Sequence, residues 1–436
     1  MKILLINPGL TSASGEKRKK RSKGLFPPLN LALIAAYTPR HHQIELVDVH
    51  ITELNPNCNP DLVGITVMTA FAPRAYQLAD RFRARGIPVV LGGMHPSALP
   101  EEALRHADAV VVGEAEQTWA KVIDHAEQGR LKGVYRSEGY PDLKEMLIPR
   151  RGLWRAEDYL VPQTVQTTRG CPYSCSFCAV SNFFGRTYRF RPVTEVIKEV
   201  KSLPGKLITF VDDNITGNFQ YAKELFRQLK PAKKYWVSQA SLNMAADEEL
   251  LRLAAGSGCL GMFIGLESIS PENLQSIGKK VNLVNIKQAV KKIQRHGIGI
   301  EGAFIFGMEH DDENVFERTL SFAEELRLEG AQFGVLTPLP GTKLYRELES
   351  AGRIFDRNWS HYTVNRVVFT PLQMSARRLQ EGLDWAWGKF FSYPSILKRL
   401  GFLRKHLLLF WLFNLVSRSR VYNYLKQTTV EPVAWN

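Results

Sequence analysis

Short apolar runs alternate with amphipathic stretches of helical spacing over the first 135 residues of the chain. The runs are rich in Val, Ile and Leu, which is typical of strands buried in a parallel sheet. The pattern predicts strands at Lys2–Asn7, Ile44–Asp48, Leu62–Val67, Val89–Gly92 and Ala109–Gly113, and helices at Asn30–Tyr37, Pro73–Arg85 and Glu116–Glu127. Because such alternation builds βαβ units, residues 1–135 are expected to form a doubly wound, flavodoxin-like domain.

A second α/β series follows residues 136–160, a stretch of proline, glycine and charge that predicts a linker. Between 161 and 345 the predicted strands are Gln163–Thr168, Leu207–Asp212, Tyr235–Gln239, Gly261–Gly265, Ile298–Phe306 and Gln332–Thr337. The predicted helices are Val193–Leu203, Tyr221–Leu229, Asp247–Ala255, Val284–Arg295 and Asn314–Leu328. Six such units fit a partial (β/α)6 TIM barrel, in which chemistry lies at the carboxyl ends of the strands.

The remaining residues, 346–436, are expected to be mostly helical. Within them Leu397–Arg420 is apolar and basic, and its apolar core, Leu407–Val416, is too short to span a bilayer. The segment fits a helix on a membrane surface or one buried against the barrel, and we favour the buried helix.

Composition narrows the class of protein. Hydrophobic residues make up 44% of the 436 residues and charged residues 23%, as in ordinary globular proteins. The net charge of +14 suits nucleic acid, an anionic membrane face or an anionic substrate, but much of it is local, at Lys17–Lys23 and in the tail. Five cysteines are too few for a disulfide scaffold, and the N-terminal run does not resemble a signal peptide. We therefore expect a cytoplasmic protein.

The stretch Val165–Val180 carries the most specific pattern, a C-x3-C-x2-C triplet formed by Cys171, Cys175 and Cys178. A structural zinc site usually has four ligands in two pairs, and no second pair is present. A [4Fe-4S] cluster normally has four cysteine ligands, so three would leave one iron open for chemistry. We favour the cluster over zinc, as much because of the family that this loop resembles as because of the number of ligands.

This loop resembles the signature of the radical SAM superfamily. The resemblance implies that the open iron binds S-adenosylmethionine (SAM), whose cleavage yields a 5'-deoxyadenosyl radical. It also implies SAM contacts from polar residues after the strands: Asp212, Asp213, Gln239 and Glu267. Arg186, which follows the cysteines, is a candidate partner of the SAM carboxylate. Arg169, Arg189 and Arg191 are further candidates for the SAM carboxylate, although loop anchoring is favoured for the last two. The usual G-G-E amine motif is replaced here by Asp212-Asp213-Asn214.

The N-terminal domain resembles the cobalamin-binding domain that precedes many radical SAM domains. The G-G-x-H-P-S and V-G-E-x-E segments carry this resemblance, which implies cobalamin contacts at Gly92, Gly93, His95, Gly113 and Glu114. No D-x-H-x-x-G motif is present, so the resemblance does not imply a histidine ligand to cobalt. A domain that holds no corrinoid is the alternative. No G-x-G-x-x-G follows the first strand, which argues against a dinucleotide.

Together these resemblances imply a class B-like radical SAM enzyme that methylates an unactivated carbon with methylcobalamin. A non-methylating radical SAM cyclase or oxidoreductase is the second interpretation, and a zinc-containing nucleic-acid binding protein ranks below both. We expect a small-molecule substrate, with a lipid-like one as a candidate, and an electron donor such as flavodoxin or ferredoxin. No nucleic-acid partner is expected. Residues 397–420 are the candidate for peripheral contact with the inner face of a membrane.

Overall fold

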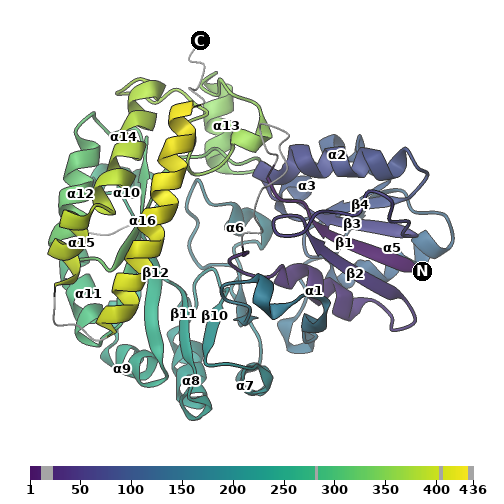
Figure 1. The fold of residues 1–436 in the computed structure, drawn as a ribbon, viewed down its shortest axis with the longest axis horizontal. Helices are drawn as coiled ribbons and strands as arrows, with labels where there is room; N and C mark the ends of the chain where they lie inside the picture. Colours follow the sequence, from purple (N-terminus) through teal and green to yellow (C-terminus); the bar gives the residue numbers. More distant parts are fainter. Residues whose placement is uncertain (11–22, 280–282, 402–405, 431–436) are drawn as a thin grey trace.

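Two α/β domains lie side by side in the computed structural model (Figure 1). The structure describes residues 1–10, 23–279, 283–401 and 406–430. The basic segment from Lys17 to Arg21, and residues 402–405 of the tail, lie outside the described residues.

The N-terminal sheet is parallel throughout, with the order β2-β1-β3-β4-β5-β6. Its strands are β1 Lys2–Asn7, β2 Gln43–Asp48, β3 Leu62–Thr66, β4 Val89–Gly92, β5 Ala109–Val112 and β6 Gly133–Arg136. Apolar clusters cover both faces: α2 (Ala72–Arg83) packs on one face, and α1 (Leu29–Tyr37) with α5 (Trp119–Glu127) on the other. The doubly wound domain is therefore confirmed.

Three details of this domain differ from the prediction. A sixth strand, β6, ends inside the expected linker. The expected loop after β4 contains two short helices, α3 (Met94–Ala98) and α4 (Pro100–Leu104). The helix expected from Glu116 begins instead at Trp119, after a 3-10 turn at Ala115–Gln117.

The second sheet is also parallel and forms a partial barrel in the order β14-β13-β12-β11-β10-β7. Its strands are β7 Thr164–Val165, β10 Leu207–Phe210, β11 Tyr235–Ala240, β12 Cys259–Glu267, β13 Gly299–Phe306 and β14 Gly330–Val335. Its outer helices are α7 Val193–Ser202, α8 Phe219–Leu229, α9 Glu248–Gly256, α11 Leu283–Arg295 and α12 Val315–Glu325. The partial barrel is confirmed.

The first barrel strand is shorter than predicted, because the chain leaves the sheet after Val165. Residues Thr168–Arg169 form β8, which pairs antiparallel with β9, Arg189–Phe190. The 19 residues between these two short strands, 170–188, include all three cysteines of the triplet. The cysteine loop is thus closed at its base by its own pair of strands.

Side chains alternate regularly along the central strands of the barrel. Met262, Ile264 and Leu266 of β12 are buried, whereas Gly261, Phe263 and Gly265 are only partly buried. Burial alternates in the same way along β13, where Glu301 is partly exposed. Alternate side chains of a strand point to opposite faces, and on the partly exposed face of β12 two of three positions are glycine. Neighbouring atoms approach both glycines closely: the carboxylate of Glu267 lies beside Gly265, and the backbone of Gly299 lies beside Gly261.

The tail contributes three helices, α14 (Ala376–Phe390), α15 (Tyr393–Leu400) and α16 (Leu407–Val430). α16 runs across the barrel on the side shown in front in Figure 1. Its Phe410 and Phe413 contact the positions of Gly299 and Gly330, and Asn414 is fully buried. Leu408, in contrast, is 86% exposed. The predicted burial of this helix against the barrel therefore applies to one of its faces only. Within the described parts of the chain, no helix has the length and apolarity needed to cross a bilayer.

Candidate active site

The cysteine triplet lies between β8 and α6 (Ala179–Phe183), with all three cysteines partly buried. Burial raises the pKa of each thiol, that of Cys175 to about 11. Lys279 acts in the opposite direction on Cys171 and Cys175, since a nearby cation stabilises a thiolate. The amide nitrogen of Asn214 lies 3.9 Å from the sulfur of Cys171.

The number of cysteines suits a cluster better than a structural zinc ion. Zinc sites usually have four ligands in two pairs, whereas in a cubane each thiolate binds a different iron. Among the described residues, one group of three candidate ligand atoms lies within 4.8 Å of one another, and it consists of His41, His42 and Glu127.

Asp212 holds the residues at the start of the cysteine loop in place. It is fully buried, and its Oδ1 accepts hydrogen bonds from the backbone and the hydroxyl of both Thr167 and Thr168. Burial raises its pKa to about 6. The contacts of this oxygen are to the chain itself, so the structure places Asp212 beneath the loop rather than on its open side.

Arginines tie the base of the loop to the N-terminal domain. Arg169 binds the carboxylates of Glu114 and Glu116, the latter at 2.5 Å, and Arg189 binds Glu114 at 2.5 Å. Arg191 pairs with Glu199 at 2.6 Å. Arg189 and Arg191 anchor the loop, as predicted. Arg169, a further candidate for the SAM carboxylate, here binds two buried acidic side chains with its guanidinium.

Other predicted SAM contacts surround the loop. Glu267 ends β12 with a left-handed backbone (φ 64°), and its carboxylate binds Lys279 at 2.6 Å. Gln239 is an exposed side chain of β11. Burial and the neighbouring Asp212 raise the pKa of Asp213 to about 7. Arg186 is exposed and forms no ion pair with a described residue.

Two cavities adjoin the carboxyl ends of the N-terminal strands. The larger, about 670 Å³, is lined on one side by Met68, Met94 and Gly113 and on the other by Asn182 and Phe183 of α6 and by the segment after β14. The smaller, about 430 Å³, reaches between the strand ends and α1 and includes Gly92, Gly93 and Gly113. Glu114 lines both cavities.

Gly93 is required by the backbone. Its φ is 104°, and a Cβ there would lie 2.8 Å from the carbonyl oxygen of Val67. This close approach of the β3 and β4 ends shapes the floor of the smaller cavity, which a side chain would disturb.

His95 does not face either cavity, contrary to the prediction. It is fully buried, with Nε2 3.2 Å from Glu102 and Nδ1 3.4 Å from the hydroxyl of Thr69. Glu102 also accepts hydrogen bonds from Tyr76 at 2.9 Å and Trp359 at 3.0 Å. Since Trp359 belongs to the C-terminal region, His95 supports a contact between that region and the N-terminal domain.

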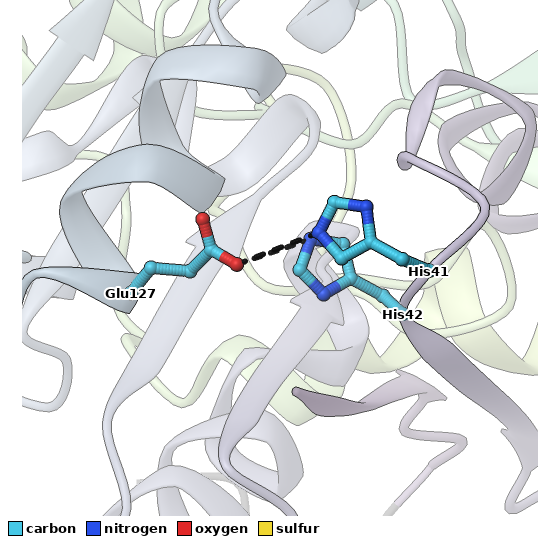
Figure 2. Close-up of side chains that lie close together, drawn as sticks. All are labelled: His41, His42 and Glu127. Carbon is cyan, nitrogen blue, oxygen red and sulfur yellow. Dashed lines mark ion pairs between the residues drawn. The ribbon is translucent and has the colours of Figure 1, made fainter.

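A separate cluster lies away from this site. The Nε2 atoms of His41 and His42 each lie 3.6 Å from one oxygen of Glu127, and Figure 2 shows the two rings directed at that carboxylate. His41 and His42 precede β2, and Glu127 ends α5. These residues are at the amino ends of the strands, opposite the two cavities.

Sequence reasoning missed two partners at the active site. Glu116 falls in the V-G-E-x-E segment, so its charge could have been matched with an arginine of the loop. Lys279 is twelve residues after Glu267 in a loop and carries no recognisable motif. Only the fold brings the two together.

Comparisons with known proteins agree with this geometry. Residues 165–323 match the family model of the radical SAM superfamily, and residues 19–123 match that of the B12 binding domain. The chain is 31% identical to bacteriochlorophyllide d C-12(1)-methyltransferase of Chlorobaculum tepidum, over 86% of this chain and 84% of that protein. It is 33% identical to the C-8(2)-methyltransferase of the same organism, over 85% and 86%.

Solved structures share the fold. The cobalamin-dependent SAM radical enzyme OxsB superposes with a TM-score of 0.73 at 16% identity, over 98% of this chain and 72% of that one. The radical SAM methyltransferase TsrM of Kitasatospora setae superposes with a TM-score of 0.69 at 15% identity, over 99% and 100%. The chain belongs to the radical SAM superfamily, in the group of enzymes that carry an N-terminal B12-binding domain.

Proposed function

We propose that the chain is a cobalamin-dependent radical SAM methyltransferase that acts on a carbon of a large, mainly apolar small molecule. The observation that carries this proposal is the larger cavity, which is lined jointly by the strand ends of the B12-binding domain and by α6, the helix that follows Cys178. A corrinoid and a radical source on its two sides would share one reaction space.

Some of these residues would hold a cofactor, and others position the parts of the chain that do so. Cys171, Cys175 and Cys178 would hold a [4Fe-4S] cluster, and Gly92, Gly93 and Gly113 would let a corrinoid approach the backbone closely. When bound, these groups supply one-electron cleavage of SAM and a transferable methyl group. We assign Asp212 and Glu114 to positioning, because Oδ1 of Asp212 and the carboxylate of Glu114 are bound by the chain itself.

On the barrel side, Glu267, Gln239, Asp213 and Arg186 remain the proposed SAM contacts. Glu267 suits the ribose hydroxyls, since a carboxylate accepts two hydrogen bonds. Lys279 fixes that carboxylate and adds a positive charge near Cys175.

The relatives and the cavity support the proposed substrate class. Two relatives act by name on bacteriochlorophyllide d, and a third, 28% identical over 76% of this chain, is a hopanoid C-2 methylase. Both named substrates are large polycyclic molecules. A cavity of about 670 Å³ is within the range of small-molecule sites, and many of its lining residues are apolar. A flavodoxin or ferredoxin is the proposed electron donor, and the cytoplasm the proposed compartment.

Anaerobic purification followed by turnover with methyl-deuterated SAM tests the proposal. We expect about four irons and one cobalamin per chain, with 5'-deoxyadenosine, S-adenosylhomocysteine and a labelled product formed together. Iron without cobalamin would refute the methylcobalamin step.

A second candidate is a radical oxidation without methyl transfer. It is favoured by two relatives named anaerobic magnesium-protoporphyrin IX monomethyl ester cyclase, each 24% identical over more than nine tenths of this chain. Formation of 5'-deoxyadenosine without S-adenosylhomocysteine, by cobalamin-replete enzyme, would decide for this candidate.

A further inference from the structure

The exposed face of α16 has an unusual distribution of apolar side chains. Leu408, Leu412, Leu415 and Val416 follow one another at helical spacing and are 86%, 61%, 41% and 44% exposed. We call these four residues the leucine stripe. On the opposite face Asn414 and Val421 are buried against the protein, with Phe410 over Gly299. A surface helix normally has apolar residues on its packed face only, so the first half of α16 has one apolar face more than packing requires.

The chain segment that contains the leucine stripe carries charge of a single sign. Residues 385–430 contain eight Lys or Arg and no Asp or Glu. Arg420 follows Leu412 and Val416 at intervals of four residues and is exposed on the same face, and Lys426 is also exposed. On the neighbouring helices α14 and α15, Lys389 and Lys398 are exposed as well. Lys398 forms an ion pair with Glu324 at 2.8 Å.

We propose that α16 docks the enzyme on an anionic phospholipid surface, with the leucine stripe inserted among the lipids and the basic residues against the headgroups. The helix lies on the face of the molecule, and no described helix can span a bilayer, so docking would be in the plane of the interface. Clusters of Lys and Arg on an amphipathic helix are attracted by anionic headgroups. An apolar stripe distinguishes this surface from one that binds nucleic acid, where phosphate contacts dominate.

The inference deepens the proposed function, because a membrane-bound enzyme would meet a large apolar substrate where that substrate collects. It is independent of the cofactors, since α16 lies outside the two cavities. Failure of docking would leave the methyl-transfer assay unaffected, and failure of methyl transfer would leave docking unaffected.

Flotation with vesicles of phosphatidylcholine, with and without phosphatidylglycerol, tests the docking. We expect the full chain to float only with phosphatidylglycerol vesicles and to be released by salt. Leu408→Ser with Leu412→Ser should weaken binding by at least about tenfold. Arg420→Gln with Lys426→Gln should weaken it by about thirtyfold.

Leu372→Ser is the matched control, because Leu372 is 59% exposed but lies outside the helix. It should leave flotation unchanged, and far-ultraviolet circular dichroism should show that all variants fold. Equal binding of the parent protein to both vesicle types would overturn the proposal. Binding of the leucine variant as tight as that of the parent protein would overturn it as well. Absence of flotation together with a dimer that the leucine variant dissociates would assign the stripe to a second copy of the chain instead.

Discussion

The carboxylate of Glu114, at the end of a strand in the B12-binding domain, binds the guanidinium of Arg169, two residues before Cys171. Both side chains are buried, at 2% and 6% exposure. An interdomain pair at this point links the strand ends of one domain directly to the cysteine loop of the other. The relative position of the two cofactor sites therefore depends on it.

Glu114→Gln is expected to loosen this link. Arg169 would keep only Glu116 as a charged partner, and breaking a buried pair costs about 3–5 kcal/mol. We expect SAM cleavage to continue while methyl transfer falls by tenfold or more, so that the ratio of 5'-deoxyadenosine to methylated product rises. Proteolysis within residues 136–160 should also accelerate. Arg155→Gln, which removes an exposed pair with Glu157, is the control and should change neither readout.

Alanine at Cys171, Cys175 or Cys178 is expected to abolish both iron retention and SAM cleavage, because each proposed iron ligand is needed to hold the cluster. Iron analysis and the absorbance of the reconstituted protein measure the first effect. Cys58→Ala, in a loop of the other domain, should behave as the parent protein does. Retained SAM cleavage in any of the triplet variants would contradict the proposed site.

Gly93→Ala should impair the corrinoid site without affecting the cluster. The added Cβ would lie 2.8 Å from the carbonyl oxygen of Val67, and the alanine would have to keep a positive φ of 104°. Such a backbone conformation costs about 1–3 kcal/mol. We expect weaker cobalamin binding by equilibrium dialysis and normal iron content. Gly152→Ala, where a Cβ would meet no atom within 4 Å, should bind cobalamin normally.

Lys279→Met is predicted to raise KM for SAM by about tenfold or more, since a charge-assisted hydrogen bond contributes about 1.5–3 kcal/mol. Without the hydrogen bond from Lys279, the carboxylate of Glu267 would no longer be held in place. Iron content should not change, and Lys279→Arg should recover part of the affinity. An equivalent change at Lys287, whose partner Glu325 is exposed, should have no effect. An unchanged KM for SAM in the Met variant would show that Lys279 does not contribute to SAM binding.

Glu301 predicts a pH dependence of stability. Burial raises its pKa from 4.5 to about 7, so between these values the folded chain holds a proton that the unfolded chain has lost. Stability should therefore fall as pH rises through this window and level off above it. Glu301→Gln should remove this slope and raise the free energy of unfolding at pH 8 by about 2 kcal/mol. Urea unfolding of the apoprotein measures both, and exposed Glu309→Gln should keep the slope.

The alternation of apolar and helical segments predicted most of the fold, because buried strands such as β3 and β5 appear in the sequence as short, continuous apolar runs. It could not predict that the chain would leave the barrel after Val165, since Thr167 and Thr168 are held by Asp212, which lies more than forty residues away. His95 was misplaced for a similar reason. Its environment depends on Glu102 and on Trp359, and a motif does not specify which way a ring turns. The cysteine triplet could be recognised without the fold, because the stretch around it resembles the signature loop of the radical SAM superfamily.

The incomplete barrel has two outer strands whose backbone groups could pair with another sheet. One of them, β7, is only two residues long. The other, β14, is covered at its end by a hydrogen bond of 2.7 Å from the amide of Val335 to the carbonyl of Val364. A very short edge and a covered edge both discourage strand addition from other molecules. The barrel can thus remain open toward its substrate without becoming a template for aggregation.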